Sequence, residues 1–376
     1  MRIILAISSL GAGGAERVLT LLAGALAERG HEVWLVTLAR SADDFFCVDA
    51  RVRRVGLGLM GDSPNVMRGL WANVRRLRAL RRIVSTVEPH AVLSFLTSMN
   101  VLVILACMRL PVRVIVSERV DPAAHTENRI WTNLRSLLYR CTHAVVVQTE
   151  TIAHWFRTRL GTRTRVVVVP NPVIPNPPGL GPSVESPCRK SAPFILAAGR
   201  LAHQKGFDLL IRAFAIAAAR AQQVQLVIAG EGPEGQSLRD LAAELQLGSQ
   251  VVFPGRLRDL TALMKTALAF ILPSRYEGFP NVLLEAMAAG TPCVAADCPG
   301  ATREILAGGA YGLLVPPEDL AALTAAIDRM IADSELRRRY ALAGTAAVER
   351  YRLDRVVVEW ERLLEGRDVT LEASGQ

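Results

Sequence analysis

Short apolar segments alternate with segments of helical periodicity along almost the whole chain, and this alternation constrains the fold more than any other feature. Buried strands that are each followed by a helix predict parallel sheets with crossover helices. Strands are expected at residues 3–7, 33–38, 52–57, 91–95, 112–117, 144–147 and 165–169, and then at 194–198, 226–229, 251–253, 270–272 and 293–295.

A proline-rich stretch separates the two series of strands. Proline cannot donate a backbone hydrogen bond to a sheet, so this stretch predicts a linker between two α/β domains. The length of 376 residues and the hydrophobic content of 51% also suit two domains. The expected division is a Rossmann-like domain over 1–170, a linker over 171–193, a second Rossmann-like domain over 194–350, and a helix with a tail over 351–376 that returns toward the first domain. The last helices are expected at 318–329, 334–350 and 354–364, without intervening strands.

The run EGFPNVLLE, bracketed by Glu277 and Glu285, joins a glycine-bearing loop to an expected helix start. Pro280 suits the first helical position and Gly278 permits close backbone approach, so the N–H groups of the first turn can face a phosphate or sugar oxygen. Glu285 is expected about two turns inside this helix. Two separated carboxylates suit a ligand that carries both diphosphate and sugar. An ordinary capped helix is the alternative.

Two loops that follow expected strands carry further candidates. GRLAHQKGFDLL places Arg200 and Lys205 between a strand and a helix, where two cations can hold a diphosphate without a metal. In SSLGAGGAERV, Gly13 and Gly14 allow backbone amides to approach an anion, although a tight turn explains these glycines equally well. This loop lacks the GxGxxG spacing of nicotinamide-binding proteins.

Metal ligands are not expected in this chain. Asp43 and Asp44 have the character of loop residues, and the histidines show no ligand spacing. The six cysteines are scattered and predict reduced thiols of a cytosolic protein. The first apolar run, MRIILAIS, is followed by GAGGAER rather than by a cleavage region, and the longest apolar stretches are too short to span a bilayer.

The net charge of +9 is concentrated in the first half of the chain. Residues 1–180 hold 23 arginines and 12 acidic residues, a net charge of +11, whereas the remainder carries −2. One expected helix there has arginines on one side, at Arg68, Arg75, Arg78 and Arg82, and apolar residues on the other, at Val66, Leu70, Val74, Leu77, Leu80 and Val84. This pattern predicts a lipid surface or a lipid-linked diphosphate as partner, against the alternative of a solvated helix face. Nucleic acid is not expected, because no recognition motif or aromatic platform accompanies the charge.

Seven segments together resemble glycosyltransferase family 4, the retaining nucleotide-sugar transferases of the GT-B architecture. They are GGAERVL, PNPV, GRLAHQKGFDLLIRAF, LVIAGEGPE, VVFPGRL, PSRYEGFPNVLLEAMAAGTPCVA and YGLLVPPED. The resemblance implies an α/β fold with two doubly wound Rossmann-like domains facing across a cleft. It also implies that the first domain binds the acceptor and the second binds the nucleotide-sugar donor.

The resemblance assigns roles to particular residues. Arg200 and Lys205 would hold the diphosphate, and Glu285 would bind the ribose. The donor sugar would contact Glu277 and the backbone of Gly278, Phe279, Pro280 and Asn281. The backbone near Arg256 and Leu257 would border the base, while Gly13 and Gly14 would face donor phosphate or acceptor.

The sequence departs from the family pattern at one position. Many members carry a histidine at the end of the first-domain strand that reads VIVSERVDP here, so Glu118 and Arg119 stand near its usual place. This SER-type variant is similar to members that build exopolysaccharide, lipopolysaccharide or lipid-linked oligosaccharide. Helix capping or an internal ion pair is the structural alternative for both residues.

The resulting expectation is a metal-independent, retaining transferase on the inner face of the cell membrane. It would move a hexose or N-acetylhexosamine from a UDP-linked donor to a lipid-linked or polysaccharide glycan acceptor. A GT-B nucleotide-sugar epimerase is the chief alternative, although it would leave the basic helix without a purpose. A non-catalytic sugar-nucleotide or lipid-binding protein is a third class. The sequence leaves the sugar, the linkage, the acceptor and the oligomeric state open.

Overall fold

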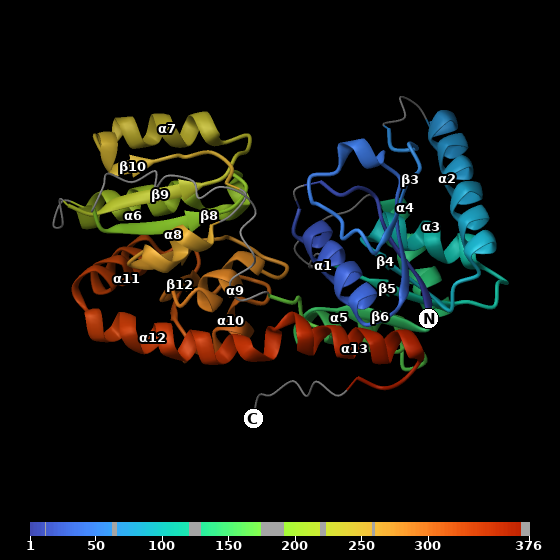
Figure 1. Cartoon of the computed structure of the whole chain (residues 1–376). Coiled ribbons are helices and arrows are strands. Elements are labelled where there is room, and N and C mark those ends of the chain that lie inside the picture. The colour runs from blue at the N-terminus through green and yellow to red at the C-terminus, as the bar shows by residue number, and fades with distance from the viewer. Residues whose placement is uncertain are drawn as a thin grey trace. The chain divides into compact units, whose positions relative to one another are not determined.

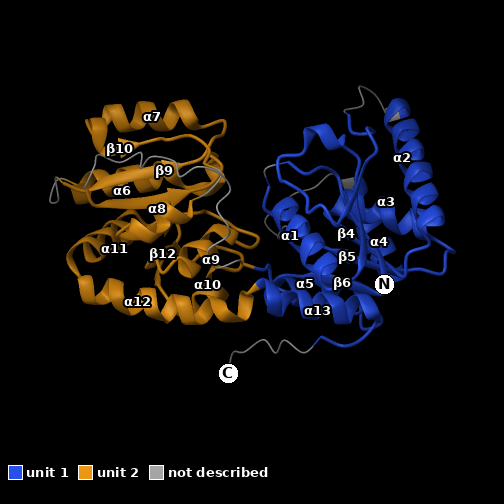
Figure 2. Cartoon of the chain, viewed as in Figure 1, with its two compact units in different colours: residues 1–172, 353–376 blue, residues 173–352 orange. Residues whose placement is uncertain are grey.

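The chain folds into two compact units (Figure 2), which a computed structural model describes over residues 1–11, 13–61, 66–119, 129–173, 192–218, 223–257 and 260–369. Unit 1 combines residues 1–172 with residues 353–376, and unit 2 comprises residues 173–352. The chain therefore leaves unit 1 once and returns to it. Most of the predicted linker, residues 174–191, lies outside the described residues.

The described part of unit 1 contains a seven-stranded parallel sheet with the order β3-β2-β1-β4-β5-β6-β7. Its strands are β1 (Arg2–Ile7), β2 (Glu32–Thr37), β3 (Arg53–Gly56), β4 (Ala91–Phe95), β5 (Arg113–Ser117), β6 (Ala144–Val147) and β7 (Val166–Val168). The strand order reverses between β1 and β4. In sheets of this kind ligands bind beyond the carboxyl ends of the strands at such a switch point.

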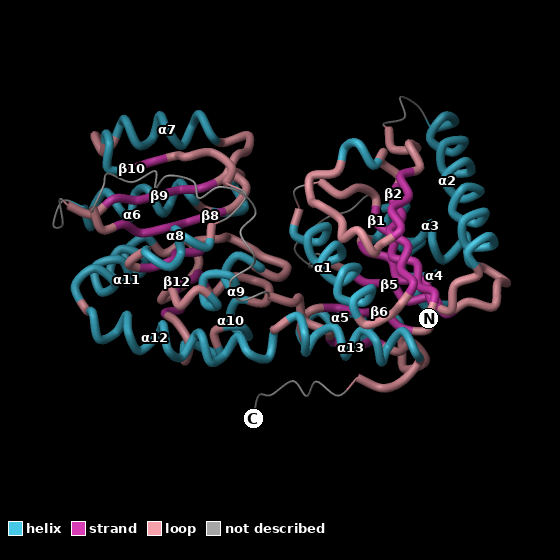
Figure 3. The backbone as a smooth tube through the Cα atoms, viewed as in Figure 1, coloured by secondary structure: helices cyan, strands magenta, loops and turns pink. Residues whose placement is uncertain are grey.

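Helices cover both faces of this sheet (Figures 1 and 3). They are α1 (Gly14–Glu28), α2 (Val66–Val87), α3 (Thr97–Cys107), α4 (Arg129–Leu138), α5 (Glu150–Leu160) and α13 (Leu353–Glu365), with short 3-10 helices at Ser41–Asp43 and Tyr139–Cys141. Successive strand residues point to opposite faces, so Ile3 packs with α1 and α13, whereas Ile4 packs with α2, α3 and α5. The first face is completed by α13, whose Trp360 is fully buried.

Unit 2 contains a six-stranded parallel sheet in its described part, with the order β10-β9-β8-β11-β12-β13. Its strands are β8 (Phe194–Ala198), β9 (Gln225–Ala229), β10 (Val251–Val252), β11 (Ala269–Leu272), β12 (Cys293–Ala296) and β13 (Leu313–Val315). The order reverses between β8 and β11. Strand β13 was not predicted, because three apolar residues between Gly312 and Pro316 are too few to show a period.

The helices of unit 2 also cover both faces of its sheet. They are α6 (Phe207–Ala218), α7 (Gly235–Glu244), α8 (Thr261–Thr266), α9 (Asn281–Ala288), α10 (Thr302–Ile305), α11 (Leu320–Ala332) and α12 (Ser334–Ala347), with 3-10 helices at His203–Lys205, Gly248–Gln250, Ala307–Gly309 and Val348–Tyr351. One core cluster packs α6, α7 and α11 against the sheet, and the other packs α8 and α9. The predicted helix over 334–350 is α-helical to Ala347 and continues as the last 3-10 helix.

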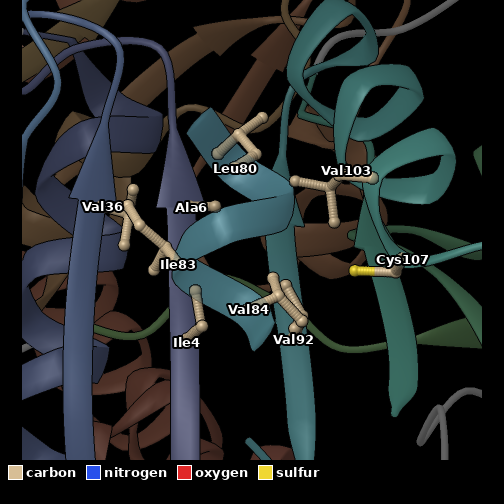
Figure 4. A pocket seen from close by; sticks show the side chains of 10 residues that line it. Ile4, Ala6, Val36, Leu80, Ile83, Val84, Val92, Val103 and Cys107 are labelled. Atoms are coloured by element: carbon tan, nitrogen blue, oxygen red, sulfur yellow. The ribbon is translucent and has the colours of Figure 1, made fainter. Parts of the chain in front are cut away.

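A small apolar cavity lies between the sheet of unit 1 and helices α2 and α3 (Figure 4). Its volume is about 10 Å³, which is at the lower limit for a single water molecule. The lining is aliphatic apart from Cys107, and burial raises the pKa of that thiol to about 12. This cavity is a packing gap and has neither the size nor the polar groups of a substrate site.

Candidate functional site

Two charged side chains meet at the switch point of unit 2. Lys205 follows β8, Glu277 follows β11, and these two strands are neighbours in the sheet. The Lys205 ammonium donates a hydrogen bond to Oε1 of Glu277 at 2.6 Å, and the Ser274 hydroxyl donates to the same oxygen at 2.6 Å. The exposed fractions of the two charged side chains are 16% and 6%. The structure therefore brings two predicted site residues together as a largely buried ion pair.

Glycines allow the loops around this pair to approach closely. Gly206 has a φ of +64°, and a Cβ at this residue would clash with the carbonyl oxygen of Pro273. Gly300 has a φ of +127°, and a Cβ there would clash with the carbonyl oxygen of Glu277. Larger residues would push these loops apart, so glycine at both positions lets the loops lie close enough for the ion pair to form.

Arg275 joins the same two loops but was not selected from the sequence. Its guanidinium forms a bidentate pair with Asp208 at 2.9 and 2.8 Å and donates to the carbonyl oxygen of His203 at 2.7 Å. The Nε atom donates to Glu318 at 3.0 Å. The hydrogen bond to Asp208, and after it the one to Glu318, raises the pKa of Arg275, although burial acts in the opposite direction. Because Asp208 is 67 residues away in sequence, only the fold reveals this partner.

Helix α9 begins one residue later than predicted. Pro280 is its N-cap and Asn281 is its first residue, so Pro280 does not occupy the first helical position. Glu285 is the fifth residue of α9 and lies about one turn inside the helix, not the expected two. Proline has no side-chain acceptor with which to cap a helix, and the N-terminus of α9 lacks a side-chain cap from it. The Phe279 ring packs edge-on against Tyr351, with centroids 6.1 Å apart.

The other donor-side candidates lie on loops at the same edge of the sheet. Arg200 is exposed and makes no hydrogen bond or ion pair with its side chain within the described chain. Arg256 is also exposed, and its Nε lies 3.9 Å from a carboxylate oxygen of Glu231. Leu257 is half-buried and packs against the core cluster that contains α8 and α9. The described geometry therefore leaves the Arg200 guanidinium available for a ligand.

The glycine loop of unit 1 leads directly into α1. Gly13 is the N-cap and Gly14 is the first helical residue. The carboxylate of Glu16 folds back onto this end of the helix, since a Cβ at Gly13 would clash with it. Burial raises the pKa of Glu16. The N-terminus of α1 thus already has a carboxylate of the protein against it, with which any ligand anion would compete.

Glu118 is part of a buried hydrogen-bond network behind the carboxyl end of β5. Its carboxylate accepts from the Thr97 hydroxyl at 3.0 Å and from the Tyr139 hydroxyl. Asn100 also donates to the Tyr139 hydroxyl, at 2.8 Å. Burial, followed by the charge of Glu118, raises the pKa of Tyr139 well above its usual range.

Arg119 is buried on the other side of this strand end. Its guanidinium lies over the Phe95 ring, 3.6 Å from the centroid, and 5.5 Å from the centroid of Trp360. One nitrogen donates to the side-chain oxygen of Asn171, whereas Nε and Nη2 are buried and have no hydrogen-bond partner among the residues that the structure describes. Burial lowers the pKa of Arg119 well below its usual range. Unsatisfied buried donors of this kind are costly and call for an explanation.

Helix α2 carries the predicted arginine stripe on its exposed surface. Arg68, Arg75, Arg78 and Arg82 are all exposed. Among the described side chains of the opposite side, Leu80 and Val84 in the C-terminal half of the helix join the core. Leu70, on the apolar side of the sequence pattern, is 64% exposed. The apolar period continues past the point where the helix stops packing on the core.

Exposed apolar side chains accompany this stripe. Met67 and Trp71 are 71% and 63% exposed, and Met60, which precedes the helix, is 59% exposed. Together with Leu70 and the four arginines they form what we call the α2 surface. Helix α2 has no acidic residue. Within the described ranges, no helix is long and apolar enough to span a membrane. The same ranges contain no group of three or more His, Cys, Asp or Glu residues that could hold a metal ion.

Two family models match consecutive parts of the chain. The model described as Glycosyltransferase Family 4 matches residues 12–176, and the model described as Glycosyl transferases group 1 matches residues 184–346. An uncharacterized glycosyltransferase of Haemophilus influenzae is 25% identical over 94% of this chain and 96% of its own length. An exopolysaccharide phosphotransferase of Streptomyces coelicolor is 30% identical over 58% of this chain, but the match spans only 23% of that protein.

A third relative has a more specific name. It is an α-1,4-N-acetyl-D-galactosaminyltransferase of Campylobacter jejuni, named for a diphosphoundecaprenol-linked glycan, and it is 26% identical over 68% of both chains.

Solved structures share the fold over nearly the whole chain. Sucrose-phosphate synthase from Thermosynechococcus elongatus superposes with a TM-score of 0.82, at 20% identity over 97% of this chain and 98% of the other. The Anabaena protein HepE in complex with UDP-glucose superposes with a TM-score of 0.78, at 20% identity over 97% and 99%. With the two family models and the two Rossmann-like sheets, these findings show that the chain belongs to glycosyltransferase family 4 and has the GT-B fold.

Proposed function

We propose that this protein is a retaining, metal-independent transferase that moves a hexose or N-acetylhexosamine from a UDP-sugar to a lipid-linked or polysaccharide glycan acceptor. The observation that carries the proposal is the Lys205–Glu277 pair at the switch point of unit 2, next to the start of α9. The Campylobacter relative's name supports an acceptor linked to a lipid diphosphate, and the HepE complex supports a UDP-linked donor.

The donor diphosphate binds to Arg200 and Lys205 in this proposal. Lys205 is paired with Glu277 in the structure, so the diphosphate competes with this carboxylate for the ammonium. Once Lys205 turns to the phosphates, the Glu277 carboxylate can accept hydrogen bonds from sugar hydroxyls, while Ser274 still holds one of its oxygens. The same ion pair therefore supplies a cation for the diphosphate and an acceptor for the sugar.

The remaining donor contacts come from neighbouring loops. The backbone of Gly278, Phe279, Pro280 and Asn281 borders the sugar, and Glu285 accepts hydrogen bonds from the ribose. The backbone of Arg256 and Leu257 borders the base.

Transfer breaks the bond between the anomeric carbon and the donor diphosphate. Negative charge develops on the leaving diphosphate, where Arg200 and Lys205 stabilise it. The acceptor hydroxyl attacks from the face that the diphosphate leaves, and a diphosphate oxygen takes its proton, so the configuration is retained. Two cations neutralise the charge, and a divalent ion is therefore not required.

The acceptor belongs to unit 1 in this proposal. Gly13 and Gly14 border the acceptor or the donor phosphate, although an anion must compete there with Glu16. Of the two residues at the SER position, Arg119 is the stronger candidate for a ligand contact. Two of its buried nitrogens lack partners within the described part of the chain, whereas Glu118 accepts hydrogen bonds from two hydroxyl groups.

We further propose that the α2 surface docks on the anionic inner face of the cell membrane. Arginine stems with exposed methionine and tryptophan side chains suit the boundary between headgroups and acyl chains. Each arginine near an anionic surface contributes about 1 kcal/mol, and salt weakens this contribution. A variant with glutamine in place of all four arginines should sediment less with anionic vesicles, and its activity on a short soluble acceptor should persist. The four positions are Arg68, Arg75, Arg78 and Arg82. Equal sedimentation of both proteins would leave a solvated helix face.

A panel of nucleotide sugars tests the proposed reaction. The protein is incubated with each donor, with and without membrane extract, and the release of UDP and the anomeric configuration of the product are measured. Transfer that requires the extract and survives chelation supports the proposal. Conversion of the donor sugar without an acceptor would identify an epimerase, and binding without turnover would identify a non-catalytic protein.

A further inference from the structure

Arg275 connects three loops at the carboxyl edge of the unit 2 sheet. It lies on the loop after β11, two residues before Glu277. It pairs with Asp208 at the start of α6, contacts the loop after β8 through the His203 carbonyl, and reaches Glu318 before α11. Its side chain is 15% exposed, and its pair with Asp208 is partly buried, whereas Glu318 is 66% exposed. One side chain therefore sets the spacing of several segments around the switch point.

The backbone reinforces this connection. The Arg275 N–H donates to the carbonyl oxygen of Gln204 at 2.8 Å, and the Gln204 side chain donates to the carbonyl oxygen of Tyr276 at 3.0 Å. Gln204 directly precedes Lys205. The loop that carries the ammonium is thus bonded at several points to the loop that carries the Glu277 carboxylate.

The charge on Asp208 belongs to this arrangement. Burial would raise the pKa of Asp208, but the hydrogen bonds and charge of Arg275 outweigh burial, so the pKa is lowered. Arg275 and Asp208 are consequently both charged near neutral pH. A bidentate pair of this kind fixes orientation as well as distance, which a single point charge cannot do.

We propose that Arg275 is a positioning residue that holds Lys205 in place for the donor diphosphate. This inference rests on the proposed function and extends it. The Arg275 guanidinium contacts Asp208, Glu318 and the His203 carbonyl, so Arg275 acts on the donor through these loops. The attraction between the Lys205 ammonium and a phosphate falls as their distance grows, so a displaced ammonium binds the diphosphate less tightly. Loss of Arg275 should therefore weaken diphosphate binding through Lys205.

A double-mutant cycle tests this coupling. UDP affinity is measured by calorimetry on the full chain for wild type, Arg275→Ala, Lys205→Met and the double variant. We expect Arg275→Ala to weaken UDP binding about 10-fold in the wild-type background and less than about 3-fold when Lys205 is already absent. An equal factor in both backgrounds would overturn the inference, because the effect of Arg275 would then be independent of Lys205.

Further variants keep the test informative if Arg275→Ala folds poorly. Arg275→Lys retains the charge but loses the bidentate geometry, and Asp208→Asn removes the partner charge at constant volume. Both variants should weaken UDP binding when Lys205 is present and weaken it much less in the Lys205→Met background. Arg338→Ala is the matched control, since Arg338 forms an exposed ion pair with Glu335 on α12, and it should bind UDP as wild type does.

The outcomes separate this inference from the proposed function. If the wild-type protein binds UDP and the Arg275→Lys and Asp208→Asn variants bind it with the same affinity, the positioning role alone is overturned. Failure of the wild-type protein to bind UDP would overturn the proposed function and the inference with it.

Discussion

The Lys205–Glu277 pair should be a measurable source of stability for unit 2 as well as a donor site. Lys205→Met leaves the Glu277 carboxylate, which is 6% exposed, with Ser274 as its remaining described side-chain donor. Removing one partner of a buried ion pair typically costs about 3–5 kcal/mol, and the Ser274 hydrogen bond places the expected loss near about 3 kcal/mol. Glu277→Gln should cost a similar amount, and the double variant should cost about 2 kcal/mol less than the sum of the two.

Urea unfolding of the full chain can assign this loss to the correct unit. All five tryptophans lie in unit 1, so their fluorescence follows unit 1, whereas far-ultraviolet circular dichroism follows both units. The unfolding of unit 2 is the transition that circular dichroism detects and fluorescence does not. If the free energy of unfolding falls by about 2 kcal/mol per molar urea, Lys205→Met should lower the midpoint of this transition by about 1.5 M. The midpoint measured by fluorescence should stay unchanged.

Two results would refute this reasoning. Additive losses in the double variant would mean that the two side chains contribute independently, despite their separation of 2.6 Å. A shift of less than about 0.5 kcal/mol in both single variants would mean that water solvates the pair as well as the protein does. The Arg338→Ala variant provides the control for a surface charge in the same unit.

Four further changes have expected outcomes. Arg200→Ala should lower turnover about 10- to 1000-fold in a UDP-release assay, and full activity would remove it from the diphosphate site. Glu285→Ala should mainly weaken donor affinity measured by calorimetry, since the ribose changes little during transfer; a large fall in turnover at unchanged affinity would contradict this role. Exhaustive chelation should leave transfer intact, and rescue by a divalent ion would show that a metal participates. Trp360→Ala, at a fully buried position, should destabilise unit 1 by about 3–5 kcal/mol in thermal unfolding, and a native midpoint would contradict its place in the core.

The strands could be predicted well because their apolar runs are bounded by turn residues. The expected strands at residues 91–95, 144–147 and 194–198 match β4, β6 and β8 to the residue. Strand β13 could not be predicted, because its pairing with β12 identifies it more clearly than its own three residues do. The start of α9 was one residue off, because Pro280, a residue type that favours the first helical position, is the N-cap here.

The site was only partly accessible from the sequence. Lys205 and Glu277 were placed at strand ends, but their contact depends on the order that makes β8 and β11 neighbours. Ser274 and Arg275 gave no local signal, because a serine and an arginine in a loop are ordinarily solvated. The exposure of Leu70 could not be predicted either, since periodicity shows which side of a helix is apolar but not how far the core extends beneath it.

The division of unit 1 into two chain segments has a consequence for its synthesis. Helix α13 supplies Val356, Trp360, Leu363 and Leu364 to the same core as α1, yet the ribosome makes all of unit 2 before it makes α13. At usual translation rates this interval lasts roughly ten seconds or more. During it, the nascent unit 1 presents an uncovered apolar strip beside α1, while unit 2 has its whole sequence in one continuous piece. A chaperone that shields apolar segments would therefore have more time to bind unit 1, which is synthesised first, than to bind unit 2.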